Sequence, residues 1–227
     1  MPMPVLTFSD SSEYYGIPVF TFSIPAGYTC PGAEKCLAYA HRQTGKIING
    51  KDQTFRCYAA TGERFPGVRD SAWRNYDLVR SQETKGKMFA MISGSIPHMA
   101  SHIRVHQGGD MFSQMYFDAW LMTARMQPHR LFWTFTKNLP IWIERLGQIP
   151  NNFKLTASKG GKWDHLIEEH SLRYAEVFHS WHKARRSGLP IDTDDKLAYG
   201  DGGSFALVLN SAPVMVPQFG DPIQIIA

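Results

Sequence analysis

Short runs of strand-forming residues recur along this chain, and most of them end in polar or glycine-rich sequence that leads into a helix-like segment. Such runs occupy Val19 to Ile24, Ile103 to Gln107, Leu131 to Thr136, Phe153 to Ala157 and Ser204 to Leu209. A repeated unit of a strand, a polar end and a helix is typical of a parallel sheet with crossover helices. The sequence therefore predicts an α/β fold, either an open parallel sheet of about six strands or a partial (β/α) barrel.

The helices between these runs are marked by capping residues and by apolar periodicity. Tyr174 to Phe178 allows two interpretations: a strand, or part of one helix from Leu166 to Arg186, because apolar residues recur there at helical spacing. We favour the strand, with Ser180 capping the helix that follows. Further helices are expected at about Asp70 to Gln82, Lys87 to Ala100 (broken near Pro97), Gln114 to Arg125 (capped by Ser113) and Ile141 to Leu146.

Composition limits the class of protein. The 227 residues are 43% hydrophobic and 19% charged, which are globular values, and we expect a single domain. The net charge of +4 is modest and spread along the chain, so nucleic acid is not indicated as a partner. Met1 to Asp10 lacks the features of a secretory signal, and no apolar run is long enough to cross a bilayer. We therefore expect a cytoplasmic protein without a membrane partner.

The three cysteines, Cys30, Cys36 and Cys57, all fall inside one stretch of the chain. In a reducing compartment, thiols gathered in this way are more naturally ligands or free thiols than disulfide partners. Three thiolates can hold a [4Fe–4S] cluster with one iron left open, whereas structural zinc needs a fourth protein ligand. Nearby Lys35, Arg42 and Arg56 would favour the thiolate form.

Two other interpretations of the cysteines stay open. The thiols could be buried or free without binding anything, or they could hold zinc together with His41. The step of six positions from Cys30 to Cys36 is wider than the usual spacing in zinc fingers.

A second candidate site follows the strand that ends near His106. Gly108 and Gly109 would let a ligand approach the backbone, and Asp110 could accept hydrogen bonds from an ammonium or hydroxyl group. A tight strand-to-helix turn with a capping acid would have the same sequence. The position at the same end of a strand as the cysteine loop favours a functional role, because sites gather where parallel strands end.

Equivalent strand ends carry Lys137 and Ser158. Lys137 could bind a carboxylate or phosphate, as could Lys159, and the glycines after Lys159 offer backbone donors. Asp192, Asp194 and Asp195 could hold Mg²⁺ or a ribose, although a run of aspartates in a turn is usually solvated. Five aromatic residues recur at helical spacing and are expected in the core: Trp73, Tyr76, Tyr116, Phe117 and Trp120.

Several of these segments together resemble a phage family known as gene product 88. The segments are SIPAGYTCPGAEKC, FRCYAA, VHQGGDMFSQMYFDAW, FTKNLPIW, NFKLTASKGG and GLPIDTDD, and they extend from about Phe20 to Leu209. The resemblance implies a phage-encoded protein and does not by itself imply a reaction.

More distantly, the three-cysteine loop and the Gly-Gly-acid strand end are similar to radical S-adenosylmethionine enzymes. That similarity implies that Cys30, Cys36 and Cys57 ligate a [4Fe–4S] cluster whose open iron binds S-adenosylmethionine. Gly108, Gly109 and Asp110 would then face the cofactor. The family separates its cysteines by three and then two residues, whereas five and twenty residues separate them in this chain.

The sequence thus gives two hypotheses. The first is an iron–sulfur protein, an enzyme in its stronger form, whose open iron takes a small-molecule ligand, with Asp110 and Lys137 as catalytic residues and Ser158 at the cofactor. The second is a non-enzymatic binding protein in which a cluster or zinc staples the loop between Cys36 and Cys57 and presents a surface to a bacterial host protein.

Overall fold

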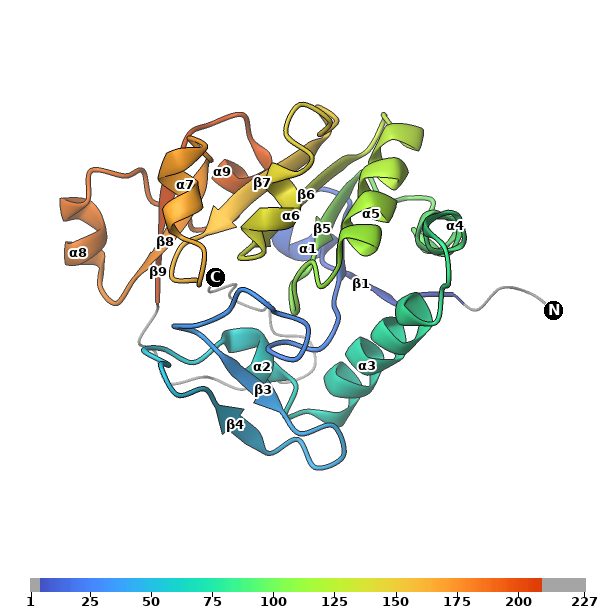
Figure 1. Cartoon of the computed structure of the whole chain (residues 1–227), viewed down its shortest axis with the longest axis horizontal. Helices are drawn as coiled ribbons and strands as arrows, with labels where there is room; N and C mark the ends of the chain where they lie inside the picture. Colours follow the sequence, from blue (N-terminus) through green and yellow to red (C-terminus); the bar gives the residue numbers. More distant parts are fainter. Residues whose placement is uncertain (1–4, 210–227) are drawn as a thin grey trace.

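The centre of the computed structural model, which describes residues 5–209, is a seven-stranded sheet in the order β1-β2-β5-β6-β7-β8-β9 (Figure 1). β1 runs antiparallel to β2, and every other pair of neighbours in this sheet is parallel. The strands are β1 (Phe8–Asp10), β2 (Val19–Phe22), β5 (His102–Val105), β6 (Leu131–Thr136), β7 (Phe153–Ser158), β8 (Tyr174–Phe178) and β9 (Phe205–Val208).

Crossover segments with helices connect the parallel strands. The connection from β2 to β5 is the longest, and it also holds a two-stranded hairpin of β3 (Ala38–Ala40) and β4 (Ile47–Asn49). The helices are α1 (Ser12–Tyr15), α2 (Tyr58–Gly62), α3 (Pro66–Arg80), α4 (Lys85–Ser95), α5 (Gln114–Met126), α6 (Leu139–Ile143), α7 (His165–Glu169), α8 (Trp181–Arg186) and α9 (Lys196–Tyr199). None of the helices in the described range is long and apolar enough to span a membrane.

The two faces of the sheet bury separate apolar clusters, because successive side chains of a strand point to opposite faces. Phe22, Ile103 and Phe132 belong to the larger cluster, which also takes in residues of α3, α4 and α5. Val19 and Trp133 face the other way, toward α1 and α9. Figure 1 shows α5 and α6 over the near face of the sheet. The larger cluster also takes in residues of α6 and α7, so the crossover helices α3 to α7 pack on this face, whereas α9 packs on the other.

The predicted α/β class with a parallel sheet and crossover helices is confirmed. The predicted strand over Tyr174–Phe178 is correct, and a continuous helix from Leu166 to Arg186 is wrong because β8 separates α7 from α8. Ser113 caps α5 as predicted, its Oγ accepting from the N–H of Tyr116 at 3.3 Å. Helix α4 ends at Ser95, before the proline that was expected to break it. The five aromatic residues expected in the core are all buried.

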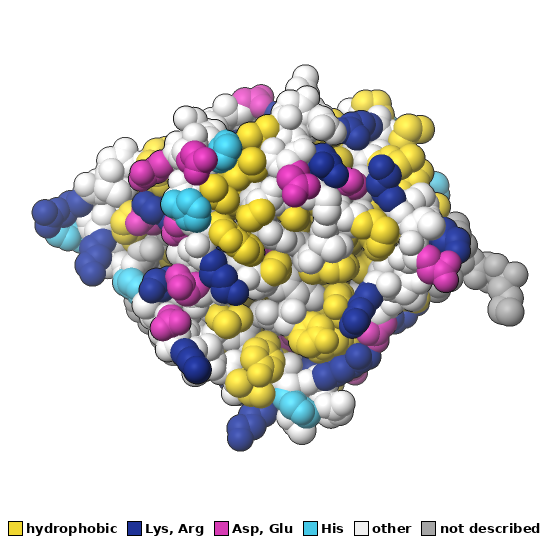
Figure 2. Space-filling view, viewed as in Figure 1, with side chains coloured by type: hydrophobic (Ala, Val, Ile, Leu, Met, Phe, Trp, Pro, Cys, Tyr) yellow, Lys and Arg dark blue, Asp and Glu magenta, His cyan; other side chains and the backbone are white. Residues whose placement is uncertain are grey.

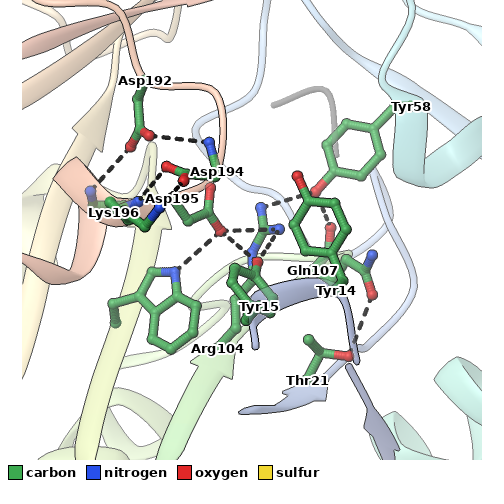
Figure 3. A network of polar contacts seen from close by, with 12 residues as sticks. Tyr14, Tyr15, Thr21, Tyr58, Arg104, Gln107, Asp192, Asp194, Asp195 and Lys196 are labelled. Atoms are coloured by element: carbon green, nitrogen blue, oxygen red, sulfur yellow. Dashed lines mark hydrogen bonds and ion pairs between the residues drawn. The ribbon is translucent and has the colours of Figure 1, made fainter. Parts of the chain in front are cut away.

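A buried ion pair joins the sheet to the segment that carries α9 (Figure 3). Arg104 on β5 and Asp195 lie 3.1 Å apart, and their side chains are only 2% and 3% exposed. The Oδ2 atom of Asp195 also accepts from the hydroxyl of Tyr15 at 2.9 Å and from the indole N–H of Trp133 at 3.3 Å. The sequence suggested Mg²⁺ or a ribose as a ligand of Asp192, Asp194 and Asp195. In the structure, the carboxylate of Asp195 is instead paired with the buried guanidinium of Arg104.

The same arginine reaches toward the cysteine loop. Its Nη2 atom donates to the hydroxyl of Tyr58 at 3.3 Å, and that hydroxyl donates to the carbonyl of Gln107 at 2.7 Å. Tyr58 follows Cys57 directly in the chain. Arg104 therefore links the first turn of α2, the sheet and the α9 segment.

We expect Asp195→Asn to lower the free energy of unfolding by about 3–5 kcal/mol, because it leaves the Arg104 guanidinium buried without a charged partner. Urea denaturation measures the change. Asp201→Asn is the matched control, since it removes an ion pair between Lys154 and a carboxylate that is 89% exposed, and it should leave stability nearly unchanged. Equal effects of the two substitutions would contradict the role given to Asp195.

Candidate functional site

The carboxylate of Asp110 ties the end of β5 to the end of β6. It is buried, and its Oδ1 atom accepts from the N–H of Met111 at 2.7 Å and from the hydroxyl of Thr136 at 2.6 Å. Its Oδ2 atom accepts from the N–H of Lys137 at 2.8 Å. Burial raises the pKa of Asp110, and these three donors oppose the rise because they favour the charged form. The residue lies at the carboxyl edge of the parallel strands, where α/β proteins place their sites.

Lys137 continues this connection to the next strand. Its buried ammonium group donates to the carbonyl of Ser158 at 2.6 Å, to the hydroxyl of Ser158 at 3.0 Å and to the carbonyl of Lys159 at 2.8 Å. Asp110, Lys137 and Ser158 therefore form one chain of hydrogen bonds across the ends of β5, β6 and β7. The structure brings together three residues that the sequence placed at separate strand ends.

Two glycines allow the surrounding loops to approach this edge closely. Gly109 has a φ of +87°, and a Cβ atom there would lie 2.4 Å from Cγ1 and 2.7 Å from the carbonyl oxygen of Ile24. A Cβ atom on Gly32 would lie 2.2 Å from the carbonyl oxygen of Lys137. The contacts with the carbonyl oxygens of Ile24 and Lys137 are with backbone atoms, which a small side-chain movement cannot relieve. Gly32 therefore lets the cysteine loop lie against the backbone that follows β6, and Gly109 lets the turn after β5 lie against Ile24.

The cysteine loop is also held to the segment after β7 by backbone pairing. The N–H of Lys35 donates to the carbonyl of Gly160 at 3.2 Å, and the N–H of Lys162 donates to the carbonyl of Gly32 at 3.0 Å. Ala33 and Gly161 form an isolated antiparallel bridge between the same two segments. These bonds fix the loop that carries Cys30 and Cys36 against the ends of β6 and β7.

The three thiols lie in one region and are not joined in a disulfide. Ionised Cys36 would raise the pKa of Cys57, and both would raise the pKa of Cys30, so each pair of sulfurs is close enough to interact electrostatically. Burial is the main cause that raises the pKa of all three thiols, that of Cys57 to about 11. The N–H of Gly27 donates to the sulfur of Cys30 at 3.3 Å.

Asp110 and Lys137 act on these thiols. Asp110 raises the pKa of Cys30, whereas the Lys137 ammonium lowers that of Cys36. The cation that favours the thiolate of Cys36 is thus Lys137, which directly follows β6, whereas the sequence suggested Lys35, Arg42 and Arg56. Arg42 instead pairs with Asp77 on α3. Over residues 5–209, no three or more His, Cys, Asp or Glu side chains are grouped so as to hold a metal ion.

The two histidines considered near the site have other surroundings. His41 is exposed at the end of β3, and its Nδ1 atom accepts from the N–H of Thr44 at 3.3 Å. His106 is buried, and its Nε2 atom bonds to the hydroxyl of Tyr116 at 2.9 Å. Burial lowers the pKa of His106 to about 3, so its ring is neutral at physiological pH.

Glu63 is a buried residue beside the cysteines that we did not identify from the sequence. It is only 2% exposed, and its Oε1 atom accepts from the N–H of Ala26 at 2.7 Å. Its Oε2 atom is buried and has no hydrogen-bond partner in the described part of the chain. Burial raises the pKa of Glu63 to about 7, and the negative charge of Glu63 raises the pKa of Cys57. No local motif marks this glutamate, because only the packing of α2 beneath the cysteine loop buries it.

The fold and site define an α/β protein with three free thiols above the carboxyl edge of a parallel sheet. A family model described as Gene product 88 matches residues 7–212, so the chain belongs to this family, and the predicted phage family is confirmed. No curated protein and no solved structure matches the chain. The comparisons thus give no support to the distant similarity to radical S-adenosylmethionine enzymes.

We expect Gly109→Ala to lower the melting temperature strongly, because the added Cβ atom meets the backbone of Ile24 at a positive φ. Gly86→Ala is the control, since a Cβ atom there meets nothing within 4 Å and lies in the first turn of α4. That variant should be as stable as the parent or slightly more so. A Gly109→Ala protein that melts with the parent would show that this close contact is not required.

We also expect Glu63 to make stability depend on pH. Its folded pKa of about 7 exceeds the ordinary glutamate value of 4.5, so the stabilisation from its bound proton is complete below about pH 4.5 and is lost as the pH rises through 7. The free energy of unfolding of the parent should therefore decline between pH 5 and 8. Glu63→Gln should reduce this decline by on the order of 2–3 kcal/mol. Urea denaturation across this range measures it, with the exposed Glu83→Gln as control. If the stability of Glu63→Gln and of the parent changed with pH in the same way, Glu63 would not be the source of the pH dependence.

Proposed function

We propose that Cys30, Cys36 and Cys57 ligate a [4Fe–4S] cluster at the carboxyl edge of the sheet, and that the fourth iron takes a small ligand. The observation that carries the proposal is that three free, partly buried cysteines lie where backbone bonds hold the loop of Cys30 and Cys36 against the strand ends, and each thiol affects the pKa of another. Neighbouring thiols resist ionising together unless a cation compensates their charge. An iron–sulfur centre supplies that charge.

The position of His41 argues against a single zinc ion. Thiolates on one tetrahedral ion lie about 3.8 Å apart when the Zn–S distance is about 2.3 Å. In a cluster each thiolate binds a different iron, so the sulfurs lie further apart. Residues 5–209 contain no group of three His, Cys, Asp or Glu side chains placed to hold a metal ion, so the distinction rests on His41, the proposed fourth zinc ligand, which is exposed on the hairpin.

Residues around the thiols would serve such a centre. The ammonium of Lys137 would offset the negative charge of the ligated sulfurs, and the N–H of Gly27 is directed at the sulfur of Cys30. Asp110 uses three of about four acceptor positions of a carboxylate for Met111, Thr136 and Lys137, which leaves one position on Oδ2. That position suits an ammonium or hydroxyl group of the ligand.

The strand order supports placing the ligand at this edge. The six parallel strands follow one another in sequence order, which is also the order of a partial (β/α) barrel. In barrels and open α/β sheets alike, ligands bind beyond the carboxyl ends of the strands. S-adenosylmethionine is one ligand that an open iron would bind, and in that case the protein would be a radical enzyme.

Anaerobic purification followed by iron and sulfide analysis tests the cluster. We expect about four of each per chain and an absorbance shoulder near 400 nm, as three-thiolate ligation requires. Cys30→Ala, Cys36→Ala and Cys57→Ala should each lose most of the iron. His41→Ala is the control, because it should keep the iron but would lose zinc if zinc were the metal. Stoichiometric zinc without sulfide would reject the proposal.

A second function is favoured by the hairpin between Cys36 and Cys57. Tyr39 on β3 is 36% exposed, so a stapled loop would present an aromatic side chain to a bacterial host protein. Reduced protein incubated with S-adenosylmethionine distinguishes the two functions. Formation of deoxyadenosine supports the radical enzyme. The binding protein is supported if the cluster-loaded protein forms no deoxyadenosine and if the Asp110→Ala variant still binds the host protein.

A further inference from the structure

Cys57 reaches the candidate site on a different segment from the other two cysteines. Cys30 and Cys36 lie in the loop that backbone bonds hold against the segment after β7. Cys57 instead directly precedes α2, beyond the β3–β4 hairpin, and its carbonyl accepts from the N–H of Thr61 at 3.2 Å, a bond within its own segment. The position of Cys57 relative to the other thiols therefore depends on what holds α2 to the rest of the molecule.

Two side chains attach α2 to the ends of the strands. At the first residue of the helix, the hydroxyl of Tyr58 donates to the carbonyl of Gln107 at 2.7 Å. Directly after the last residue, the carboxylate of Glu63 accepts from the N–H of Ala26 at 2.7 Å. One bond thus holds the start of the helix to the turn after β5, and the other holds its end to the segment that leads into the cysteine loop.

The helix also packs closely on the turn that follows β5. A Cβ atom on Gly108 would lie 3.2 Å from the Cβ atom of Ala59 and 3.7 Å from Oε1 of Glu63. Figure 2 shows hydrophobic side chains in the region where Figure 1 draws a gap between α2 and the sheet. Helix α2 is therefore seated on the same turn that carries Asp110.

The hydroxyl of Tyr58 has a second partner on the sheet, the buried guanidinium of Arg104 (Figure 3). The Nη2 atom of Arg104 donates to this hydroxyl at 3.3 Å, and the ion pair with Asp195 fixes Arg104 in turn. The hydroxyl thus donates one hydrogen bond and accepts another, so two groups of β5 and its following turn determine where it lies. Because Tyr58 is the chain neighbour of Cys57, the same bonds hold the backbone of that cysteine.

We infer that Tyr58 is a positioning residue for Cys57: its hydroxyl, held by Arg104 and by the carbonyl of Gln107, fixes where the third sulfur meets the cluster. This role rests on the cluster of the proposed function. Since the turn after β5 carries both Gln107 and Asp110, it places the third thiol and the acid in register with each other. Groups that orient a metal ligand without touching the metal strongly affect how tightly the metal is held.

Tyr58→Phe tests this role in the whole chain after anaerobic reconstitution, because it keeps the ring and removes only the hydroxyl. We expect the variant to bind about four iron and four sulfide ions per chain, as the parent does. It should retain that iron about 10- to 100-fold less well against a chelator, the usual effect of losing a group that orients a metal ligand. The electron paramagnetic resonance spectrum of the reduced cluster should also change, because the geometry at Cys57 is no longer fixed.

Tyr15→Phe is the matched control. The hydroxyl of Tyr15 belongs to the same network, since it donates to Asp195 at 2.9 Å and accepts from Arg104 at 3.5 Å, but it comes from α1, a segment without a cysteine. Each variant loses one partly buried hydroxyl, so both should remain folded and lower the melting temperature by similar amounts. Only Tyr58→Phe should change the retention of iron and the spectrum.

The outcomes separate this role from the cluster itself. If the parent binds iron and sulfide but Tyr58→Phe and Tyr15→Phe retain iron equally well and give the spectrum of the parent, the role of Tyr58 is overturned and the cluster stands. If the parent binds no iron and sulfide, the cluster is rejected, and the role of Tyr58 is rejected with it.

Discussion

The carboxylate of Asp110 is the interaction on which the candidate site depends. Its two oxygens bind the backbone after β5, the hydroxyl that ends β6 and the N–H that follows it. Lys137, fixed in this way, extends the connection to Ser158 and Lys159. The cysteine loop then rests on the backbone of Lys137, a contact that only a glycine at position 32 permits. One buried charge thus determines the surface on which the three thiols are assembled.

Burial and charge oppose each other throughout this region. Removal from water favours the neutral forms of the thiols, of Asp110 and of Glu63, while the Lys137 ammonium and the backbone donors favour the charged forms. The cluster proposed above would supply positive charge to this region, which collects several acidic groups around one lysine. In the Arg104–Asp195 pair, by contrast, each buried charge has a partner of opposite charge. This pair, which also contacts Tyr58, holds the α9 segment on the sheet.

Much of the fold could be predicted because the periodicity of apolar residues and the capping of helices are local properties of the sequence. The strands at Leu131–Thr136 and Tyr174–Phe178 match the prediction, and Ser113 caps α5 as expected. The β3–β4 hairpin was not predicted, because its strands are only three residues long and gain their order from the hairpin pairing and packing against α2. The burial of Glu63 was not predicted for a related reason, since burial depends on neighbours that are distant in sequence.

The sequence by itself determined the class of fold, the positions of the parallel strands and the polar residues at their ends, because each follows from neighbours within a few positions. Only the tertiary structure decided which of those ends meet. It placed Lys137 beside Cys36, paired Arg42 with Asp77, and paired Asp195 with Arg104. Contacts of this kind join residues tens of positions apart, and strand order and close backbone packing, which no local pattern encodes, bring them together.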